Sequence, residues 1–250
     1  MRIVTLTALG VGGATILGAF LGLALKKITH KISDIVLAFA AGIMLAAAVL
    51  GLIIPSMETG GDFALLYTIS GIFTGAVLIN LIDKLVPHLH RLAGEDIENH
   101  SGNKKLDKLL LFVLAVAIHN FPEGIATGVS FGSGNMAGAF AVAGGIALQK
   151  IPEGMVIIAP LISVGLKPRK AFLYAALTGV VEIIGTFIGY FAVSLSSAIL
   201  PFALAFAGGT MLYVISDEMI PETHHDSSVA PTFSLLVGFS VMLITDFFLG

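Results

Sequence analysis

The sequence predicts an all-α, polytopic membrane protein with eight transmembrane helices. The chain of 250 residues is 56% hydrophobic and 12% charged, with a mean hydropathy of +0.99. This composition leaves too little polar surface for a soluble domain of that size. The apolar runs are long and lack the alternation of barrel strands, and only helices or closed barrels span a bilayer. We therefore treat residues 1–250 as one transmembrane domain.

Each predicted helix is an apolar run close to the ~20 residues that cross a bilayer. The first run follows a single Arg and has no small-residue cleavage site after it, so we expect a retained helix rather than a signal peptide. The expected spans are residues 4–25, 33–54, 63–86, 108–130, 137–160, 169–194, 198–221 and 231–249.

The basic residues between the spans predict their orientation. The second, fourth and sixth connections contain no Lys or Arg, whereas the first, third and fifth are basic. Short cytoplasmic loops collect basic residues, so we expect the odd connections in the cytoplasm and both termini outside. The expected location is the plasma membrane, which is the inner membrane in a Gram-negative cell. The basic residues are Lys26, Lys27, Lys31, Lys84, Arg91, Lys104, Lys105, Lys108, Lys167, Arg169 and Lys170.

Several function classes are excluded by composition. The absence of cysteine excludes disulfides and thiolate metal ligands. The net charge of −3 offers no nucleic-acid patch, and no nucleotide motif is present. The longest connection, residues 87–107, is a cytoplasmic segment with His88, His90 and His100. It is either a loose metal-binding loop or a solvated linker, and the sequence leaves both open.

The chain is organised around residues 111–130, LFVLAVAIHNFPEGIATGVS. Polar groups at bilayer depth usually face a bundle interior and serve a substrate path. His119 and Glu123 are four residues apart, so a helix places them on one face with Asn120 nearby. Pro122 removes a backbone hydrogen bond and frees a carbonyl close to them. An imidazole, an amide and a carboxylate suit a divalent metal such as zinc.

A second copy of this pattern follows thirty residues later. Residues 149–154, QKIPEG, resemble residues 119–124, HNFPEG, and place Gln149 four residues before Glu153. Consecutive spans are antiparallel, and broken helices that meet near the midplane are typical of transporter sites. The alternative is a pair of proline kinks whose polar groups satisfy freed backbone, and buried carboxylates are a costly way to achieve that.

Further polar residues have open roles. Glu182 is a further metal ligand, a partner for Lys150, or a helix–helix hydrogen-bonding group. Lys150 pairs with Glu153 or Glu182, or acts as a tethered cation in place of a metal. Met44 is either a metal ligand or ordinary packing. A polar cluster at the end of the seventh span is either a cytoplasmic exit or an ordinary helix end: Asp217, Glu218, Glu222, His224 and His225.

The HNFPEG and QKIPEG helices, the SDEMIPETH stretch and the eight spans resemble the ZIP family of metal transporters, especially its short bacterial members. The resemblance covers essentially the whole chain. It implies a 3+2+3 arrangement, in which helices four and five form the metal site and helices one to three are related to six to eight. Lys150 departs from the pattern, because its ammonium would repel a second divalent ion. The resemblance implies a first site of His119, Glu123, Gln149 and Glu153 capped by Met44, and a second of Asn120, Glu123, Glu153 and Glu182.

We therefore expect a transporter, not an enzyme, that imports divalent transition metals by alternating access. Zinc is the expected substrate, with Fe²⁺, Mn²⁺, Co²⁺ and Cd²⁺ left open, and no cofactor is required. The lipid bilayer surrounds the chain, and a homodimer is left open. One alternative is an intramembrane zinc-dependent hydrolase, although the chain lacks an H-E-x-x-H motif. The other is a metal-sensing membrane receptor without transport.

Overall fold

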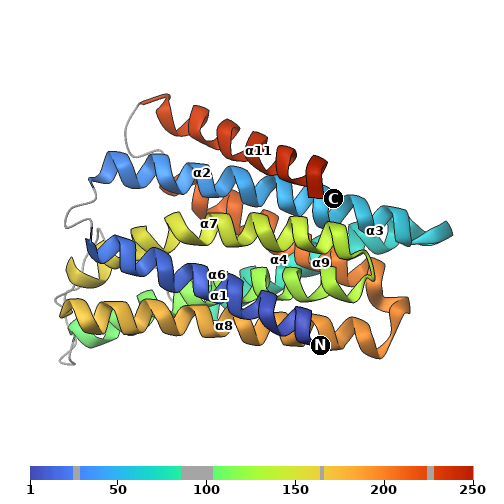
Figure 1. The fold of residues 1–250 in the computed structure, drawn as a ribbon, viewed down its shortest axis with the longest axis horizontal. Coiled ribbons are helices and arrows are strands. Elements are labelled where there is room, and N and C mark those ends of the chain that lie inside the picture. Colours follow the sequence, from blue (N-terminus) through green and yellow to red (C-terminus); the bar gives the residue numbers. More distant parts are fainter. Residues whose placement is uncertain (25–28, 86–103, 164–165, 224–227, 250) are drawn as a thin grey trace.

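The structure is a computed structural model that describes residues 1–24, 29–85, 104–163, 166–223 and 228–249 (Figure 1). The described residues form a bundle of long helices without strands. The long helices are α1 (Arg2–Ala24), α2 (His30–Ala48), α4 (Ala64–Leu85), α6 (Lys104–Gly132), α7 (Met136–Ser163), α8 (Pro168–Leu195), α9 (Leu200–Val214) and α11 (Ala230–Leu249). The short elements are η1 (Val49–Ile53), α3 (Ile54–Thr59), η2 (Gly61–Phe63), η3 (Ser197–Ile199), η4 (Ile215–Met219) and α10 (Ile220–Glu222).

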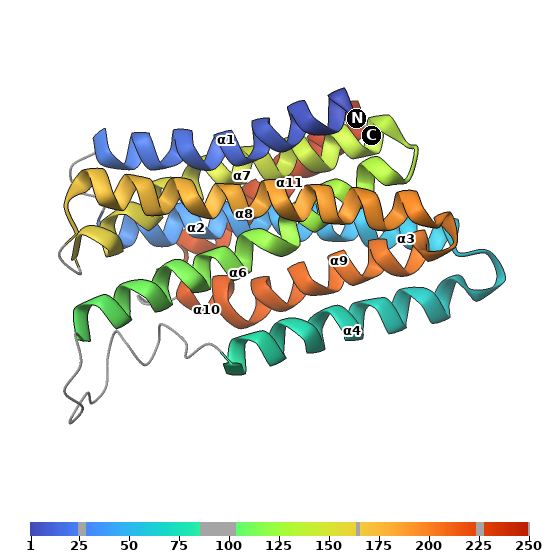
Figure 2. The ribbon, with the colours of Figure 1, turned by 90° about the horizontal axis from the view of Figure 1, so that it is seen from below.

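The prediction of an all-α polytopic membrane protein is confirmed. Within the described residues, seven helical stretches are long and apolar enough to cross a membrane. Helix α6 is not among these seven; it has 29 residues and packs against α8, α9 and α7. The outer faces expose large apolar side chains such as Phe73, Phe233 and Phe247, as a lipid-facing surface does. The two termini lie at the same end of the bundle, as an even number of spans requires (Figures 1 and 2).

The second span is longer than predicted. The sequence places its end at residue 54, before Pro55, but the helix continues to Thr59. A π-helical turn, η1, precedes the proline, and the N–H of Ile54 bonds to the carbonyl of Val49. Such a turn takes up an extra residue, so the helix passes the proline without ending there. A second π-helical turn, η4, precedes Pro221, and there the N–H of Ile220 bonds to the carbonyl of Ile215.

The predicted spans of residues 108–130 and 137–160 are each a single helix with the proline inside it. Helices α6 and α7 run without interruption through Pro122 and Pro152. Membrane helices tolerate a proline where neighbouring helices support the flanking turns, and α6 and α7 are packed on several sides. A short turn joins them, in which Gly134 has a φ of 83° that favours glycine.

Helices α1, α6, α7 and α8 pack backbone to backbone. A Cβ added at Gly154 of α7 would lie 2.5 Å from the carbonyl oxygen of Thr15 in α1. The equivalent glycine of α6, Gly124, presses in the same way on the carbonyl of Glu182 in α8. Small residues allow this close approach of membrane helices. Helix α1 therefore packs on α7 as α8 packs on α6.

Helices α2, α4, α9 and α11 form a second set. Gly42 of α2 meets the backbone of Leu235 in α11, and Gly75 of α4 meets the backbone of Phe206 in α9. Between the two sets, glycines meet side chains instead: Gly145 of α7 lies against the thioether of Met242 in α11. Glycine contacts thus join α1, α6, α7 and α8 into one closely packed set, and they join the other four helices as two pairs, α2 with α11 and α4 with α9.

An internal sequence repeat relates α1 to α8 and α2 to α9. Residues 37–45, LAFAAGIML, resemble residues 204–212, LAFAGGTML, and place Met44 at the position of Met211. Residues 12–22, GGATILGAFLG, resemble residues 179–189, GVVEIIGTFIG, and place Thr15 at the position of Glu182.

The packing of α1 on α7 is testable with two glycines of α1. At Gly22 an added Cβ would lie 2.6 Å from the carbonyl oxygen of Met155, whereas at Gly13 it would meet nothing within 4 Å. We expect Gly22→Ala to lower stability by about 1–3 kcal/mol through overpacking, and Gly13→Ala to leave it unchanged or slightly higher. Thermal unfolding in detergent measures both. Equal melting temperatures for the two variants would contradict this close packing.

Candidate functional site

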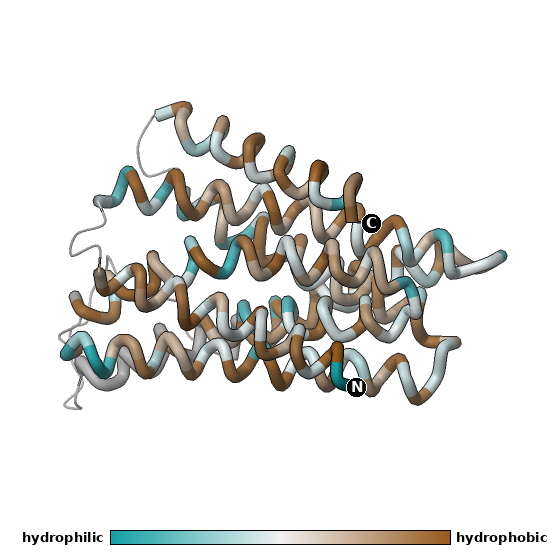
Figure 3. Tube along the Cα trace, viewed as in Figure 1, coloured by the Kyte–Doolittle hydropathy of each residue, from teal (hydrophilic) through white to brown (hydrophobic). Residues whose placement is uncertain are grey.

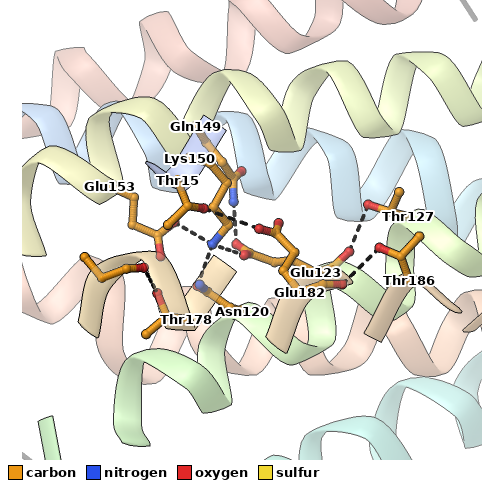
Figure 4. Close-up of polar contacts among 11 residues, drawn as sticks. Thr15, Asn120, Glu123, Thr127, Gln149, Lys150, Glu153, Thr178, Glu182 and Thr186 are labelled. Carbon is orange, nitrogen blue, oxygen red and sulfur yellow. Dashed lines mark hydrogen bonds and ion pairs between the residues drawn. The ribbon is translucent and has the colours of Figure 1, made fainter. Parts of the chain in front are cut away.

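A buried polar cluster lies where α1, α6, α7 and α8 meet (Figure 4). Glu123 of α6 is 2% exposed, and Gln149 and Lys150 of α7 and Glu182 of α8 are fully buried. The hydropathy colouring shows the matching hydrophilic stretch partway along α7 (Figure 3). Charged groups inside membrane-spanning helices are costly and mark functional sites.

Lys150 is the centre of the cluster. Its ammonium donates to Oδ1 of Asn120 at 2.8 Å and to Oε2 of Glu153 at 2.9 Å, and it forms an ion pair with Glu123. An ammonium has three hydrogens, so these three partners use all of them. Of the two pairings that the sequence left open, the structure shows the one with Glu153.

Several buried polar atoms at the site keep unused bonding capacity. Gln149 donates through Nε2 to Oε1 of Glu123 at 2.5 Å, but its own Oε1 has no hydrogen-bond partner. Nδ2 of Asn120 and Oε1 of Glu182 are likewise unsatisfied within the described part of the chain. Buried polar atoms without partners are rare and costly. A buried oxygen without a hydrogen-bond partner can accept a cation, so the oxygens of Gln149 and Glu182 suit a cation-binding site.

His119 lies at the edge of the cluster. Its side chain is 23% exposed, and Nε2 contacts the carboxylate of Glu218 from η4. Among the described residues, no three His, Cys, Asp or Glu side chains lie close enough together to hold a metal ion. The structure therefore groups Glu123, Gln149 and Glu153 around Lys150, and it turns His119 towards Glu218.

The remaining predicted residues are dispersed. Met44 of α2 is buried in an apolar cluster with Val142 and Ile146 of α7. Asp217 is exposed, and Glu222 is half-buried at the end of α10. The histidines of the third connection, together with His224 and His225, lie outside the described residues.

Thr15 is a residue of the cluster that the sequence pattern of α1 did not indicate. Thr15 of α1 is buried, and its hydroxyl donates to Oε2 of Glu182 at 3.4 Å. A Thr in an apolar helix carries little signal by itself. Its correspondence to Glu182 in the repeat of residues 12–22 and 179–189 is the signal that identifies it.

An all-helical bundle of membrane length with carboxylates and an ammonium buried between its helices defines a polytopic membrane protein of the transporter class. Residues 93–246 match the family model described as ZIP zinc transporter. The chain is 40% identical to the zinc transporter GufA of Myxococcus xanthus over 246 residues, covering 96% of each chain.

Two further relatives span almost the whole of this chain. The zinc transporter ZIPB of Bordetella bronchiseptica is 35% identical, over 95% of this chain and 78% of its own. The human zinc transporter ZIP11 is 30% identical, over 95% of this chain and 94% of its own. The chain belongs to the ZIP family of zinc transporters, and proteins of this family are transporters, not enzymes.

Proposed function

We propose that this protein imports zinc into the cytoplasm by alternating access, with the polar cluster of α6 and α7 as its transport site. The observation that carries the proposal is the pair of carboxylates, buried Glu123 and partly buried Glu153, that occupy equivalent places on two packed helices and contact the same ammonium. The names of the relatives support zinc as the substrate. Carboxylate, amide and imidazole ligands are consistent with fast exchange of such an ion.

The zinc ligands in this proposal are His119, Glu123, Gln149 and Glu153, with Met44 closing the site from α2. The unpaired Oε1 of Gln149 supports its role as a ligand. Binding requires that zinc displace the ammonium of Lys150 from the two carboxylates and that His119 leave Glu218. Cytoplasmic release would follow Asp217, Glu218, Glu222, His224 and His225, of which Glu218 already contacts His119.

The second metal position of the family pattern is occupied by Lys150 in this proposal. Its ammonium lies between Asn120, Glu123 and Glu153, three of the residues that would hold a second ion. A second divalent ion would meet a fixed positive charge in a medium that screens charge poorly. We therefore propose one zinc ion for each transport site.

We propose a 3+2+3 arrangement, in which helices one to three are related to helices six to eight around helices four and five. For the conformational change, we propose that α1, α6, α7 and α8 move together against α2, α4, α9 and α11. The backbone packing among α1, α6, α7 and α8, and the side-chain contact of Gly145 in α7 with Met242 in α11, support this division. All members of the polar cluster belong to the first set, so the site would travel with it. The basic odd connections support cytoplasmic release at their end of the bundle.

The test of this function is zinc uptake into vesicles that contain the purified protein, with Fe²⁺, Mn²⁺, Co²⁺ and Cd²⁺ as competitors. We expect uptake above that of protein-free vesicles, together with preference for zinc. Zinc binding without flux would favour the sensing receptor instead.

Uptake should weaken at acid pH. Zinc binds the deprotonated forms of His119, Glu123 and Glu153, so protons compete with zinc and the apparent affinity falls as the external pH falls. The measurement is the zinc concentration that gives half-maximal uptake between neutral pH and about pH 5.5, a range that includes the ordinary pKa of His. An affinity that stays constant over this range would contradict the proposed ligands.

A further inference from the structure

The carboxylate of Glu182 is the charged group that the one-zinc site does not use. It is fully buried in α8, and within the described residues its only side-chain hydrogen bond is the long one from Thr15. Its second oxygen, Oε1, has no partner. An ionised carboxylate inside a membrane protein is stable only when a cation or several donors balance it.

The ammonium of Lys150 has partners, but zinc binding would remove two of them. Two of its three partners, Glu123 and Glu153, are the proposed zinc ligands. When zinc takes these carboxylates, the ammonium is left buried with Asn120 as its remaining acceptor. A buried charge that loses its partner is strongly destabilising, so zinc binding would be opposed unless another carboxylate receives the ammonium.

We propose that Lys150 is an internal counter-cation that exchanges partners, moving from Glu123 and Glu153 to Glu182 when zinc binds. This inference rests on the proposed function. Glu123 and Glu153 form ion pairs with Lys150, and Glu182 belongs to the same buried cluster, where Thr15 is its hydrogen-bond donor (Figure 4). A lysine has a flexible four-carbon stem with rotatable donors, which allows its head to move between neighbouring acceptors.

Thr15 holds Glu182 ready for this exchange. Its hydroxyl donates to Oε2, which leaves Oε1 available to the ammonium. The backbone of Thr15 is itself held in place, because Gly154 of α7 packs against its carbonyl. Glu182 is thus a positioning residue that acts on zinc through Lys150, and not a zinc ligand.

A double-mutant cycle on the affinity for the first zinc ion tests the exchange. The measurement is calorimetric titration of zinc into the purified full-length protein in detergent. We expect Glu182→Gln to weaken the first zinc by about tenfold in the presence of Lys150, and by less than about threefold in a Lys150→Met background. The loss of zinc affinity caused by Glu182→Gln should disappear there, because the Lys150→Met protein has no ammonium that must move. Lys150→Gln provides a second neutral background if Lys150→Met does not fold.

Glu153→Gln is the matched control, because Glu153 contacts the same ammonium but is a proposed zinc ligand. The loss of zinc affinity caused by Glu153→Gln should be the same with Lys150 and with Met at position 150. An equal loss from Glu182→Gln with and without Lys150 would overturn the exchange and make Glu182 a zinc ligand. No loss in either background would overturn it as well. If the wild type binds no zinc, the proposed function itself is wrong. This outcome differs from one in which zinc binds but the effect of Glu182→Gln does not depend on Lys150.

Discussion

Zinc uptake falls by about 100-fold or more when Glu123 is replaced by Gln, which is the largest effect that we expect, since even outer partners of metal ligands cost 10–100-fold. Glu123 is 2% exposed and has contacts with both Gln149 and Lys150. The substitution preserves shape but removes a negative charge, so zinc would lose a proposed ligand and Lys150 would lose a counter-ion. Glu153→Gln should have a similar effect, because Glu153 is the equivalent residue on α7.

The measurement is initial zinc uptake in vesicles at equal protein content. Glu58→Gln on α3 is the matched control, since it makes the same chemical change at an exposed carboxylate. Size-exclusion profiles and melting temperatures establish that each variant is folded. A folded Glu123→Gln protein with wild-type uptake would remove Glu123 from the transport site.

The second large effect concerns the number of zinc ions. Lys150→Asp should convert the proposed one-zinc site into a two-zinc site. The substitution removes the ammonium that lies between Asn120, Glu123 and Glu153, and it adds an oxygen ligand at the same place. Glu182, with its unsatisfied Oε1, would complete the second position once no ammonium competes for it.

Anomalous scattering from zinc-loaded crystals locates and counts the ions between α6 and α7, so that metal bound elsewhere on the chain does not enter the count. Lys167→Asp, at an exposed lysine before α8, is the control and should keep one ion. Two ions in the wild type would show that Lys150 does not replace a metal. One ion in a folded Lys150→Asp protein would show that the charge of Lys150 does not prevent a second zinc ion from binding.

The sequence by itself determined the fold class, the order of the spans and the location of the polar residues in α6 and α7. These features depend on local properties: the length of apolar runs, helical spacing, and the cost of charge at bilayer depth. His119 and Glu123 could be assigned to one face because their spacing alone decides it. These local properties do not indicate the π-helical turn η1, so the second span was predicted to end before Pro55, whereas the helix continues to Thr59.

Only the tertiary structure decided which polar groups are partners. Lys150 had two carboxylates within reach in principle, and the choice of Glu153 together with Glu123 depends on how α6 and α7 pack. The contact of His119 with Glu218 joins helices that are far apart in sequence. Thr15 lies beside Glu182 because glycines bring α1, α7 and α8 together at backbone distance. Side-chain pairing across helices depends on distances of a few ångströms, and these follow from close packing between distant segments rather than from spacing along one helix.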